Sequence, residues 1–295
     1  MAKIGIFDSG YGGLTILEAI RHELPGYDYL YLGDNARAPY GTHSFDVIYQ
    51  YTLQAVRFLF EQDCALVILA CNTASAKALR TIQQKDLPVI NAQGAKRNVL
   101  GVIRPTVETV PSVTKNGHVG ILATPATVSS ESYVLELEKI YEGLSGAGGK
   151  VQVTQQACPL WVPLIENGEH NTPGADYFVD KYLHDLFARD PQIDTLVLGC
   201  THYPLLKAKI EQWVRSSAQH TKRGVQCIAQ GELVACSLAD YLIRHPEYRS
   251  QLSQGATCRY LTTENADRFS QSASVFLSTP VAAEHVSLPN FRNRS

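Results

Sequence analysis

Two apolar segments of this chain each end in a cysteine that is followed by small or hydroxylated residues. Residues 65–70 (ALVILA) lead into Cys71, and residues 195–199 (TLVLG) lead into Cys200. Short, almost wholly apolar segments are typical of strands in a parallel sheet that is covered on both faces. The repetition therefore predicts two similar scaffolds, each with a thiol at the carboxyl end of a buried strand.

Strand-like and helix-like segments alternate along most of the chain. The strand-like segments form two series, at residues 3–7, 27–32, 65–70 and 99–103 and then at 118–122, 151–155 and 195–198. Because the second series echoes the first, we expect two similar three-layer α/β domains with mostly parallel sheets, related by a pseudo-twofold duplication. Ligands of such sheets bind at the carboxyl ends of the strands, so we expect the active site in the cleft between the domains.

The predicted first domain comprises residues 1–104 and 220–295, and the predicted second domain comprises residues 105–219. The part after residue 220 is too short for a third domain. We expect it to fold back onto the first domain with strands at residues 225–228, 258–262 and 275–277.

Composition excludes several classes of function. The 26 basic and 28 acidic residues give a net charge of -2, and no block of lysine or arginine favours a nucleic-acid or membrane partner. No apolar segment approaches the roughly 20 residues that span a bilayer, and the N-terminus lacks the pattern of a signal peptide. The seven cysteines are odd in number and show no Cys-x-x-Cys spacing, which favours reduced thiols in the cytoplasm.

The ends of the predicted strands supply polar side chains that one cleft could bring together. These candidates are Asp8, Ser9, Cys71, Asn72, Thr73, Thr124, Thr127, Glu166, Cys200, Thr201 and His202. Each cysteine precedes the start of a predicted helix. The helix N–H groups are expected to favour a bound carboxylate and to lower the pKa of the thiol.

Each candidate also has a simpler interpretation. A strand-end cysteine is often a small core residue, Asp8 could only cap the following helix, and His202 could be a structural histidine. Glu166 cannot be told from its neighbour Glu169 by sequence. The glycines near residue 12 match neither nucleotide-binding pattern, and no companion pair of ligands supports a metal at Cys200.

Two opposed thiols suit reversible proton transfer at a carbon centre. One base removes a proton from one face of the carbon, and the other returns a proton to the opposite face. Cysteine suits this task because one group must be a thiolate while the other is a thiol. The carbanion of an amino acid would need a dry pocket with hydrogen-bond donors at its α-carboxylate.

The combined motifs resemble the glutamate racemases, members of the cofactor-independent aspartate/glutamate racemase superfamily. The resemblance extends over nearly the whole chain. It is carried by the segments that begin at Asp8-Ser9-Gly10, Gly33-Asp34, Pro39-Tyr40-Gly41, Cys71-Asn72-Thr73-Ala74 and Gly199-Cys200-Thr201-His202.

This resemblance implies that L- and D-glutamate interconvert without a cofactor or a metal, supplying D-glutamate for peptidoglycan synthesis. Cys71 would act on D-glutamate with help from Asp8, and Cys200 would act on L-glutamate with help from His202 and Glu166. The residues implied to hold substrate are Asp8, Ser9, Asn72, Thr73, Thr124, Thr127, Thr201 and His202, with Tyr40 and Gly41 near the side-chain carboxylate.

Three segments depart from the family pattern. Arg104 replaces a common glutamate or tyrosine, residues 91–99 look like a short insertion, and residues 229–232 (AQGE) replace a more usual Asp-Ser-Gly-Ala. All three are expected at the domain interface or the periphery, where they would affect assembly and regulation rather than the reaction.

Other functions remain open at this point. A related racemase could act on aspartate or hydantoin, although Pro39-Tyr40-Gly41 favours glutamate over aspartate. A one-thiol decarboxylase of the superfamily is disfavoured by the presence of both cysteines, as is a non-catalytic amino-acid-binding protein. The sequence leaves the assembly open, with a homodimer as one possibility.

Overall fold

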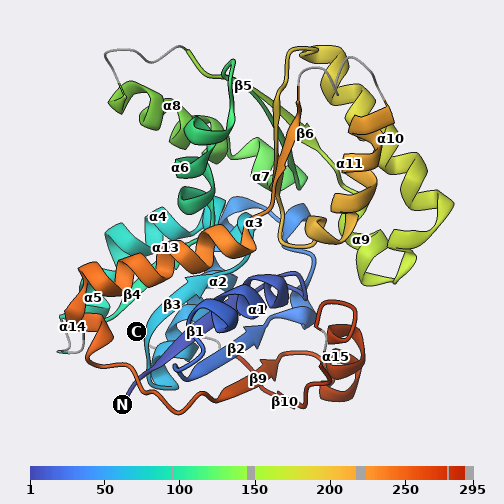
Figure 1. The fold of residues 1–295 in the computed structure, drawn as a ribbon. Coiled ribbons are helices and arrows are strands. Elements are labelled where there is room, and N and C mark those ends of the chain that lie inside the picture. Colours follow the sequence, from blue (N-terminus) through green and yellow to red (C-terminus); the bar gives the residue numbers. More distant parts are fainter. Residues whose placement is uncertain (93, 95, 145–149, 217–223, 278, 290–295) are drawn as a thin grey trace.

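The computed structural model describes residues 1–92, 94, 96–144, 150–216, 224–277 and 279–289, and its strands form two separate sheets (Figure 1). The first sheet has the strand order β10-β9-β2-β1-β3-β4. Its strands are β1 (Lys3–Asp8), β2 (Tyr29–Gly33), β3 (Cys64–Leu69), β4 (Asn98–Gly101), β9 (Cys258–Thr262) and β10 (Ala283–His285).

The second sheet has the strand order β6-β5-β7-β8. Its strands are β5 (His118–Ala123), β6 (Gln152–Ala157), β7 (Thr195–Gly199) and β8 (Gln226–Ile228). Neighbouring strands in both sheets pair in parallel. The prediction of two parallel-sheet α/β domains is therefore confirmed.

Helices cover both faces of each sheet. The helices that pack with the first sheet or lie beside it are α1 (Gly13–Glu23), α2 (Phe45–Glu61), α3 (Asn72–Lys77), α4 (Leu79–Thr81), α5 (Leu87–Asn91), α13 (Gly231–Arg244), α14 (Pro246–Arg249) and α15 (Ala266–Ala273). Those of the second domain are α6 (Ile103–Val113), α7 (Pro125–Ser129), α8 (Ser132–Gly143), α9 (Trp161–Glu166), α10 (Pro173–Arg189) and α11 (Lys207–Ser216).

Alternating side chains of the central strand β1 explain the layers of the first domain. Ile4 and Ile6 point to one face and pack with the buried residues of α1 and α13. Phe7 points to the other face and packs with Val56 and Leu59 of α2. Both faces of the strand are therefore buried among apolar side chains. This is why apolar residues follow one another along β1 rather than alternate with polar ones.

The two sheets share one strand order. Counted from the first strand of each series, β2-β1-β3-β4 and β6-β5-β7-β8 both read second, first, third, fourth. The predicted duplication is consistent with this equality. The strand β8 corrects the predicted end of the second domain. It is the counterpart of β4 and pairs with β7 in the second sheet, although its residues were predicted to belong to the first domain. The predicted return at residue 220 lies in residues 217–223, outside the described residues, and the chain rejoins the first sheet only after Ile228.

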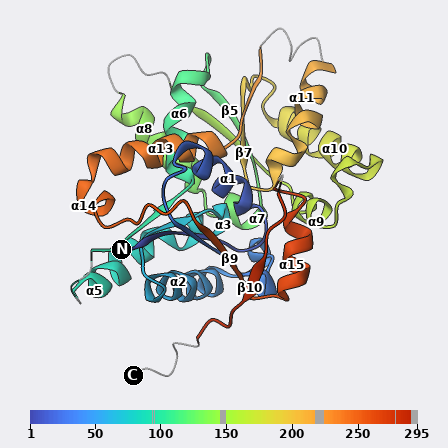
Figure 2. The same cartoon turned by 60° about the horizontal axis from the view of Figure 1, so that its bottom comes forward.

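The C-terminal part differs from the prediction in a second way. Residues 275–277 do not form a strand, because Val275 and Phe276 lie in a turn after α15 and Phe276 packs against Tyr11 with ring centroids 6.1 Å apart. The last strand is instead the unpredicted β10, beside β9 at the edge of the sheet (Figure 2). Apolar segments of three residues are too short to distinguish a strand from a helix end.

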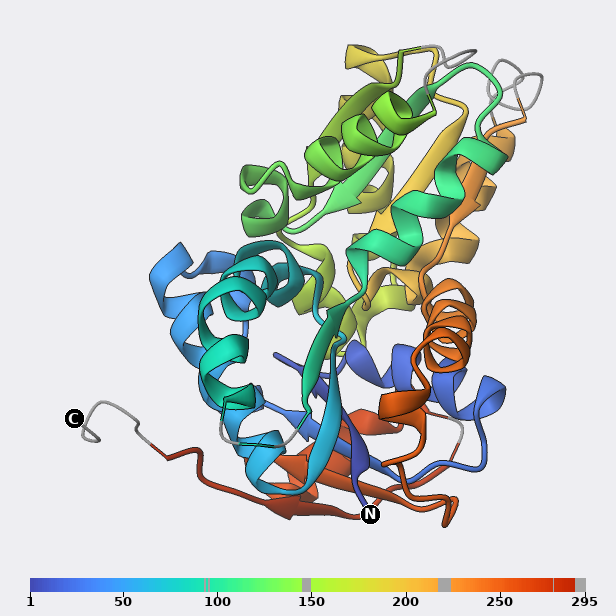
Figure 3. The ribbon, with the colours of Figure 1, turned by 90° about the vertical axis from the view of Figure 1, so that its left-hand side faces the viewer.

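The chain crosses between the domains twice. The first crossing is at Val102, between β4 and α6, and the second is at residues 229–230, between β8 and α13. Figure 3 shows both crossings in the middle of the molecule, where the green helix α6 and the orange helix α13 begin. Among the helices of the described residues, none has the length and apolar character needed to cross a membrane.

Candidate active site

A cavity at the carboxyl ends of the strands is lined by residues of both domains. Cys71 follows β3 and Cys200 follows β7, and both border this cavity with only 5% and 6% of their surface exposed. The other predicted site residues that border it are Asp8, Ser9, Tyr40, Gly41, Asn72, Thr73, Thr124, Glu166, Thr201 and His202. Thr127 does not border the cavity; it lies behind Thr124, with 3.0 Å between their hydroxyl oxygens.

Cys71 contacts polar groups from two elements. Its sulfur lies 3.2 Å from the Ser9 hydroxyl and accepts a hydrogen bond from the Ala74 backbone N–H at the start of α3. The N–H group at the start of α3 lowers the pKa of the Cys71 thiol, as expected, but it does not decide the net shift. Burial and the nearby charge of Asp8 raise the pKa of Cys71 to about 12, because they outweigh both hydrogen bonds.

Asp8 caps a turn and also borders the cavity. Its Oδ2 accepts hydrogen bonds from the backbone N–H groups of Gly10 and Gly13, at 3.1 and 3.0 Å, so it caps the turn that leads into α1. The same carboxyl group borders the cavity. Burial raises the pKa of Asp8, although the charge of His202 and these two N–H groups oppose the shift.

Cys200, His202 and Glu166 form a chain of contacts on the opposite side of the cavity. The sulfur of Cys200 lies 3.7 Å from His202 Nδ1, and His202 Nε2 lies 2.8 Å from Glu166 Oε1. Burial lowers the pKa of His202, but hydrogen bonds with Cys200 and Glu166 and their charges raise it well above its usual value. Glu169 lies outside the cavity lining and is exposed, so the geometry separates the two glutamates.

The loop after β1 approaches this chain so closely that only glycine fits. A Cβ atom on Gly12 would lie 2.3 Å from His202 Nδ1 and 2.5 Å from Thr201 Oγ1. Three residues further on, the Thr15 hydroxyl donates a hydrogen bond to the Thr201 carbonyl at 3.1 Å. The first domain therefore holds the Cys200 motif of the second domain in place.

Hydroxyl groups also connect the domains near Cys71. The hydroxyl oxygens of Thr73 and Thr124 lie 3.0 Å apart, and both side chains are buried. Thr124 caps α7 by accepting a hydrogen bond from the backbone N–H of Thr127. The cavity thus has small, fixed hydroxyl groups on the side that faces the second domain.

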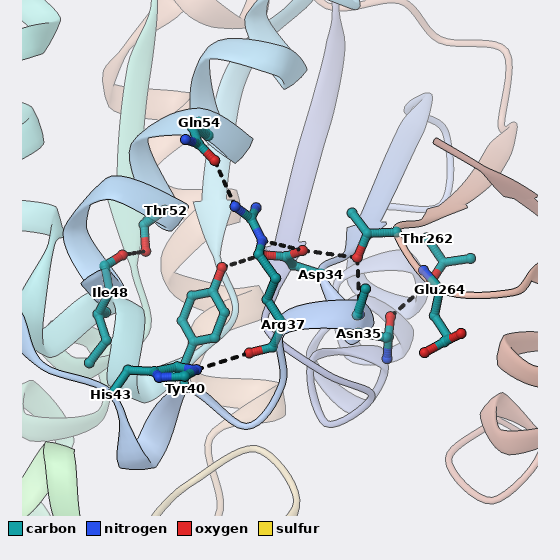
Figure 4. A network of polar contacts seen from close by, with 12 residues as sticks. Asp34, Asn35, Arg37, Tyr40, His43, Ile48, Thr52, Gln54, Thr262 and Glu264 are labelled. Atoms are coloured by element: carbon teal, nitrogen blue, oxygen red, sulfur yellow. Dashed lines mark hydrogen bonds and ion pairs between the residues drawn. The ribbon is translucent and has the colours of Figure 1, made fainter. Parts of the chain in front are cut away.

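A network of charged and polar groups behind the cavity fixes the loop that carries Tyr40 and Gly41 (Figure 4). The fully buried carboxylate of Asp34 accepts hydrogen bonds from the Tyr40 hydroxyl and from Arg37 Nε, the latter at 2.7 Å. Arg37 in turn donates to Gln54 at 2.6 Å. The sequence analysis named Asp34 only as part of a motif that carries the family resemblance. It missed Arg37 and Gln54, because their partners are distant in sequence or lie in an irregular loop.

A second buried network lies under Asn72 and includes Gln230, which was expected at the domain interface or the periphery. Gln230 lies at the crossing between the domains, is 1% exposed, and its Oε1 accepts a hydrogen bond from Asn72 Nδ2 at 2.5 Å. Tyr133 donates to the other end of the same amide, at 2.7 Å from Asn72 Oδ1. Arg104, by contrast, is exposed and paired with Glu108, as expected at the periphery.

The described residues contain no group of three or more His, Cys, Asp or Glu side chains placed to hold a metal ion. What the cavity offers is a pair of thiols, each with its own acid–base partner, and a set of neutral hydrogen-bond donors. This arrangement can move a proton on and off a carbon atom that lies between the two sulfurs.

Comparisons with known proteins identify the family. The family model for Asp/Glu/hydantoin racemases matches residues 14–235. A glutamate racemase from Ruegeria sp. (strain TM1040) is 39% identical over 291 residues, which cover 95% of this chain and 98% of that protein. A glutamate racemase from Streptococcus sanguinis (strain SK36) is 35% identical over 286 residues, with 97% and 98% covered.

A solved structure gives the same result. The crystal structure of a glutamate racemase from Bacillus anthracis superposes with a TM-score of 0.81 at 30% identity and covers 98% of both chains. The family model covers aspartate, glutamate and hydantoin racemases, whereas the relatives named here are all glutamate racemases. The chain therefore belongs to the Asp/Glu/hydantoin racemase family and, within it, to the glutamate racemases, which are amino-acid isomerases.

Proposed function

We propose that this glutamate racemase interconverts L- and D-glutamate by moving the α-proton between Cys71 and Cys200 without a cofactor. The observation that carries this mechanism is the pair of buried thiols, which border one cavity from two different domains. A solved relative from Francisella tularensis, at 31% identity and a TM-score of 0.79, was crystallised in complex with D-glutamate.

In the proposed reaction, one sulfur starts as a thiolate and the other as a thiol. The thiolate takes the α-proton, the electron pair of the broken C–H bond stays on the substrate, and the opposite thiol then donates its proton to the other face of the carbon. Each turnover therefore exchanges the protonation states of the two sulfurs. Cys71 is proposed to act on D-glutamate and Cys200 on L-glutamate, as the family resemblance implies.

Neighbouring groups act differently on the two sulfurs, because the charge of Asp8 opposes a thiolate at Cys71 whereas a protonated His202 would favour one at Cys200. Asp8 lies beside Cys71 and is proposed to assist its proton transfers. The raised pKa of His202 favours a protonated imidazole next to Cys200, with Glu166 holding the other ring nitrogen. A positive charge beside a sulfur stabilises its thiolate.

Neutral donors are proposed to bind the substrate carboxylates. Ser9, Asn72, Thr73 and Thr201, with Thr124 nearby, would hold the α-carboxylate as negative charge develops on it. Tyr40 and Gly41 would lie near the side-chain carboxylate, on the loop that Asp34 and Arg37 fix. Thr127, which lies behind Thr124, is proposed to orient that hydroxyl rather than to touch the substrate.

Incubation of D-glutamate with the enzyme in deuterated water tests the reaction. Optical rotation should fall to zero while deuterium appears at the α-carbon, with the first L-glutamate formed almost fully deuterated. Tight binding of glutamate in a calorimeter with no deuterium incorporation would instead support the amino-acid-binding alternative. Parallel assays with aspartate and hydantoins test the other substrates.

The proposed cellular role is to supply D-glutamate for peptidoglycan synthesis in the cytoplasm. A bacterial strain that requires D-glutamate for growth should grow without it when this chain is expressed there. For the assembly, the homodimer is the proposal, and light scattering tests it against the monomer mass of 32.5 kDa.

A further inference from the structure

Gln230 lies at the second domain crossing and reaches the floor of the cavity from behind. We infer that Gln230 is a positioning residue whose side-chain amide fixes the orientation of the Asn72 amide, so that Asn72 presents a hydrogen-bond donor to the substrate. This inference rests on the proposed role of Asn72 in binding the α-carboxylate. It adds a residue that does not border the cavity itself.

The contacts around Gln230 are fully buried. Its Oε1 accepts a hydrogen bond from Asn72 Nδ2 at 2.5 Å, and its Nε2 donates to Thr106 Oγ1 at 2.9 Å. The same Nε2 lies 3.0 Å from the Tyr133 hydroxyl and 3.3 Å from the Val102 carbonyl. The four side chains involved, those of Gln230, Asn72, Thr106 and Tyr133, are each at most 2% exposed.

The backbone carbonyl of Val102 determines the direction of every bond in this network. A carbonyl can only accept, so the Thr106 hydroxyl, 2.7 Å away, donates to it and must itself accept from Gln230 Nε2. Gln230 Oε1 then faces Asn72 and can only accept from the Asn72 amide nitrogen. The reversed orientation of either amide would place two donors or two acceptors against each other.

This direction leaves Asn72 with a defined chemical face. Its Oδ1 is occupied by the Tyr133 hydroxyl at 2.7 Å and by Gln230 Nε2 at 3.2 Å. Its Nδ2 uses one hydrogen for Gln230, and no second partner occurs among the described residues. The remaining N–H is therefore available to a carboxylate in the cavity, whereas a rotated amide would present an oxygen and repel it.

Substitution by an apolar residue of similar shape removes the network's central group. We expect Gln230→Met to lower kcat/KM for glutamate by about tenfold to a hundredfold, mainly through a higher KM, because Asn72 can then rotate. Gln83→Met is a control for the substitution at an exposed position: Gln83 also donates to a backbone carbonyl, that of Val99 at 2.8 Å, but it does not contact Asn72. The control should keep its kcat/KM, and a wild-type kcat/KM in Gln230→Met would overturn the inference.

A double-mutant cycle separates this inference from the proposed function. If Gln230 acts through Asn72, Gln230→Met should cause no further loss of kcat/KM in the Asn72→Ala background. Equal, additive losses would show that Gln230 acts independently, and the positioning role would be wrong while the substrate role of Asn72 stood. Wild-type activity in Asn72→Ala would instead contradict the proposed substrate contact.

The variant Gln230→Glu gives a readout that a purely structural role would not produce. A protonated carboxyl keeps an acceptor oxygen and has one O–H in place of the two N–H donors of the amide, so it can still donate to Thr106, whereas the ionised form can only accept. The titratable group in contact with Gln230 is Tyr133, whose pKa is raised by burial and by the charge of Cys200. We expect kcat/KM relative to wild type to recover as the pH falls from about 9 to about 6 in Gln230→Glu but to stay flat in Gln230→Met. Parallel ratios for the two variants, with thermal unfolding checked at each pH, would contradict the proposal.

Discussion

The Nε2 atom of His202 lies 2.8 Å from the Oε1 atom of Glu166, and this contact connects a loop after β7 to the end of α9. His202 is 5% exposed, so Glu166 is the carboxylate through which a buried imidazole can keep its proton. The pair distinguishes the surroundings of Cys200 from those of Cys71, where a carboxyl group and a hydroxyl group lie near the sulfur.

Glu166→Gln should lower the pKa of His202, because the substitution removes a negative charge but keeps an oxygen in place. Since the folded-state pKa is raised above the usual 6.5, the protonated imidazole stabilises the fold fully below about pH 6.5. That stability is lost as the pH rises through the folded-state pKa. In Glu166→Gln this loss of stability should occur at a lower pH than in the wild type. NMR of the His202 ring measures the pKa, and urea unfolding across the pH range measures the stability.

Glu169→Gln is the matched control for this prediction, because Glu169 lies three residues away and is exposed. The titration curve of His202 in the Glu169→Gln variant should coincide with the curve in the wild type. A Glu166→Gln curve that also coincides would show that the carboxylate does not hold the proton on His202.

Removal of either thiol should abolish racemisation but leave proton exchange at one face. In Cys71→Ala, Cys200 can still take the α-proton of L-glutamate and return deuterium from the solvent to the same face. L-Glutamate should therefore become deuterated without inversion, and D-glutamate should not. Cys200→Ala should show the opposite preference, and NMR of each enantiomer in deuterated water measures both.

Cys64→Ala is the control for these variants. Cys64 lies at the start of β3, where Cys71 follows its end, and burial raises its pKa to about 12 as well. It has no place in the cavity lining, so its removal should leave racemisation intact. The raised pKa therefore does not distinguish Cys64 from Cys71. The two thiols differ in their surroundings, because only Cys71 borders the cavity and lies beside Ser9. Normal racemisation in either Cys71→Ala or Cys200→Ala would refute the two-base mechanism.

Asp8→Asn should slow racemisation while making the fold less sensitive to pH. Loss of a positioned acid–base group typically costs about 10²- to 10⁴-fold in rate. Both directions should slow equally in kcat/KM, since the two enantiomers are equally stable. Because burial raises the pKa of Asp8, wild-type stability falls as the pH rises from about 3.8 through the folded-state pKa, and the variant should lack that fall. Urea unfolding curves with the same pH dependence would contradict this.

Gly12→Ala tests the close approach between the first domain and the Cys200 motif. The new methyl group would overlap His202 Nδ1 and Thr201 Oγ1, so one element must shift, at a cost of about 1–3 kcal/mol in the free energy of unfolding. The loss in kcat/KM, converted to free energy, should exceed the loss in the free energy of unfolding. The reason is that the displaced atoms include His202 Nδ1, which faces Cys200. Gly26→Ala, where nothing lies within 4 Å of the added carbon, should change neither quantity appreciably.

The sequence predicted the parts of this molecule that depend on local pattern. The apolar segments before Cys71 and Cys200 identify buried parallel strands, and the rule that ligands bind at strand ends brings Asp8, Asn72 and Thr201 to one cavity. Glu166 was separated from Glu169 only by geometry, since Glu166 ends the short helix α9 and Glu169 lies three residues further along the chain.

Three-dimensional context determined the rest. Gln230 contacts Asn72 across 158 residues of sequence, so no local pattern marks it as part of the site. The pKa of Cys71 depends on burial that outweighs a helix N-terminus, a balance that sequence alone does not give. The strand β8 belongs to the second domain because it pairs with β7. This pairing is a long-range contact, and it gives the two sheets the same strand order.

Both crossings leave their sheets from an edge strand, β4 in the first domain and β8 in the second. A change in the angle between the domains would therefore bend the backbone only near Val102 and Gln230, and no pair of hydrogen-bonded strands would have to separate. The duplicated strand order thus leaves the hydrogen bonds of each sheet independent of the angle between the two halves.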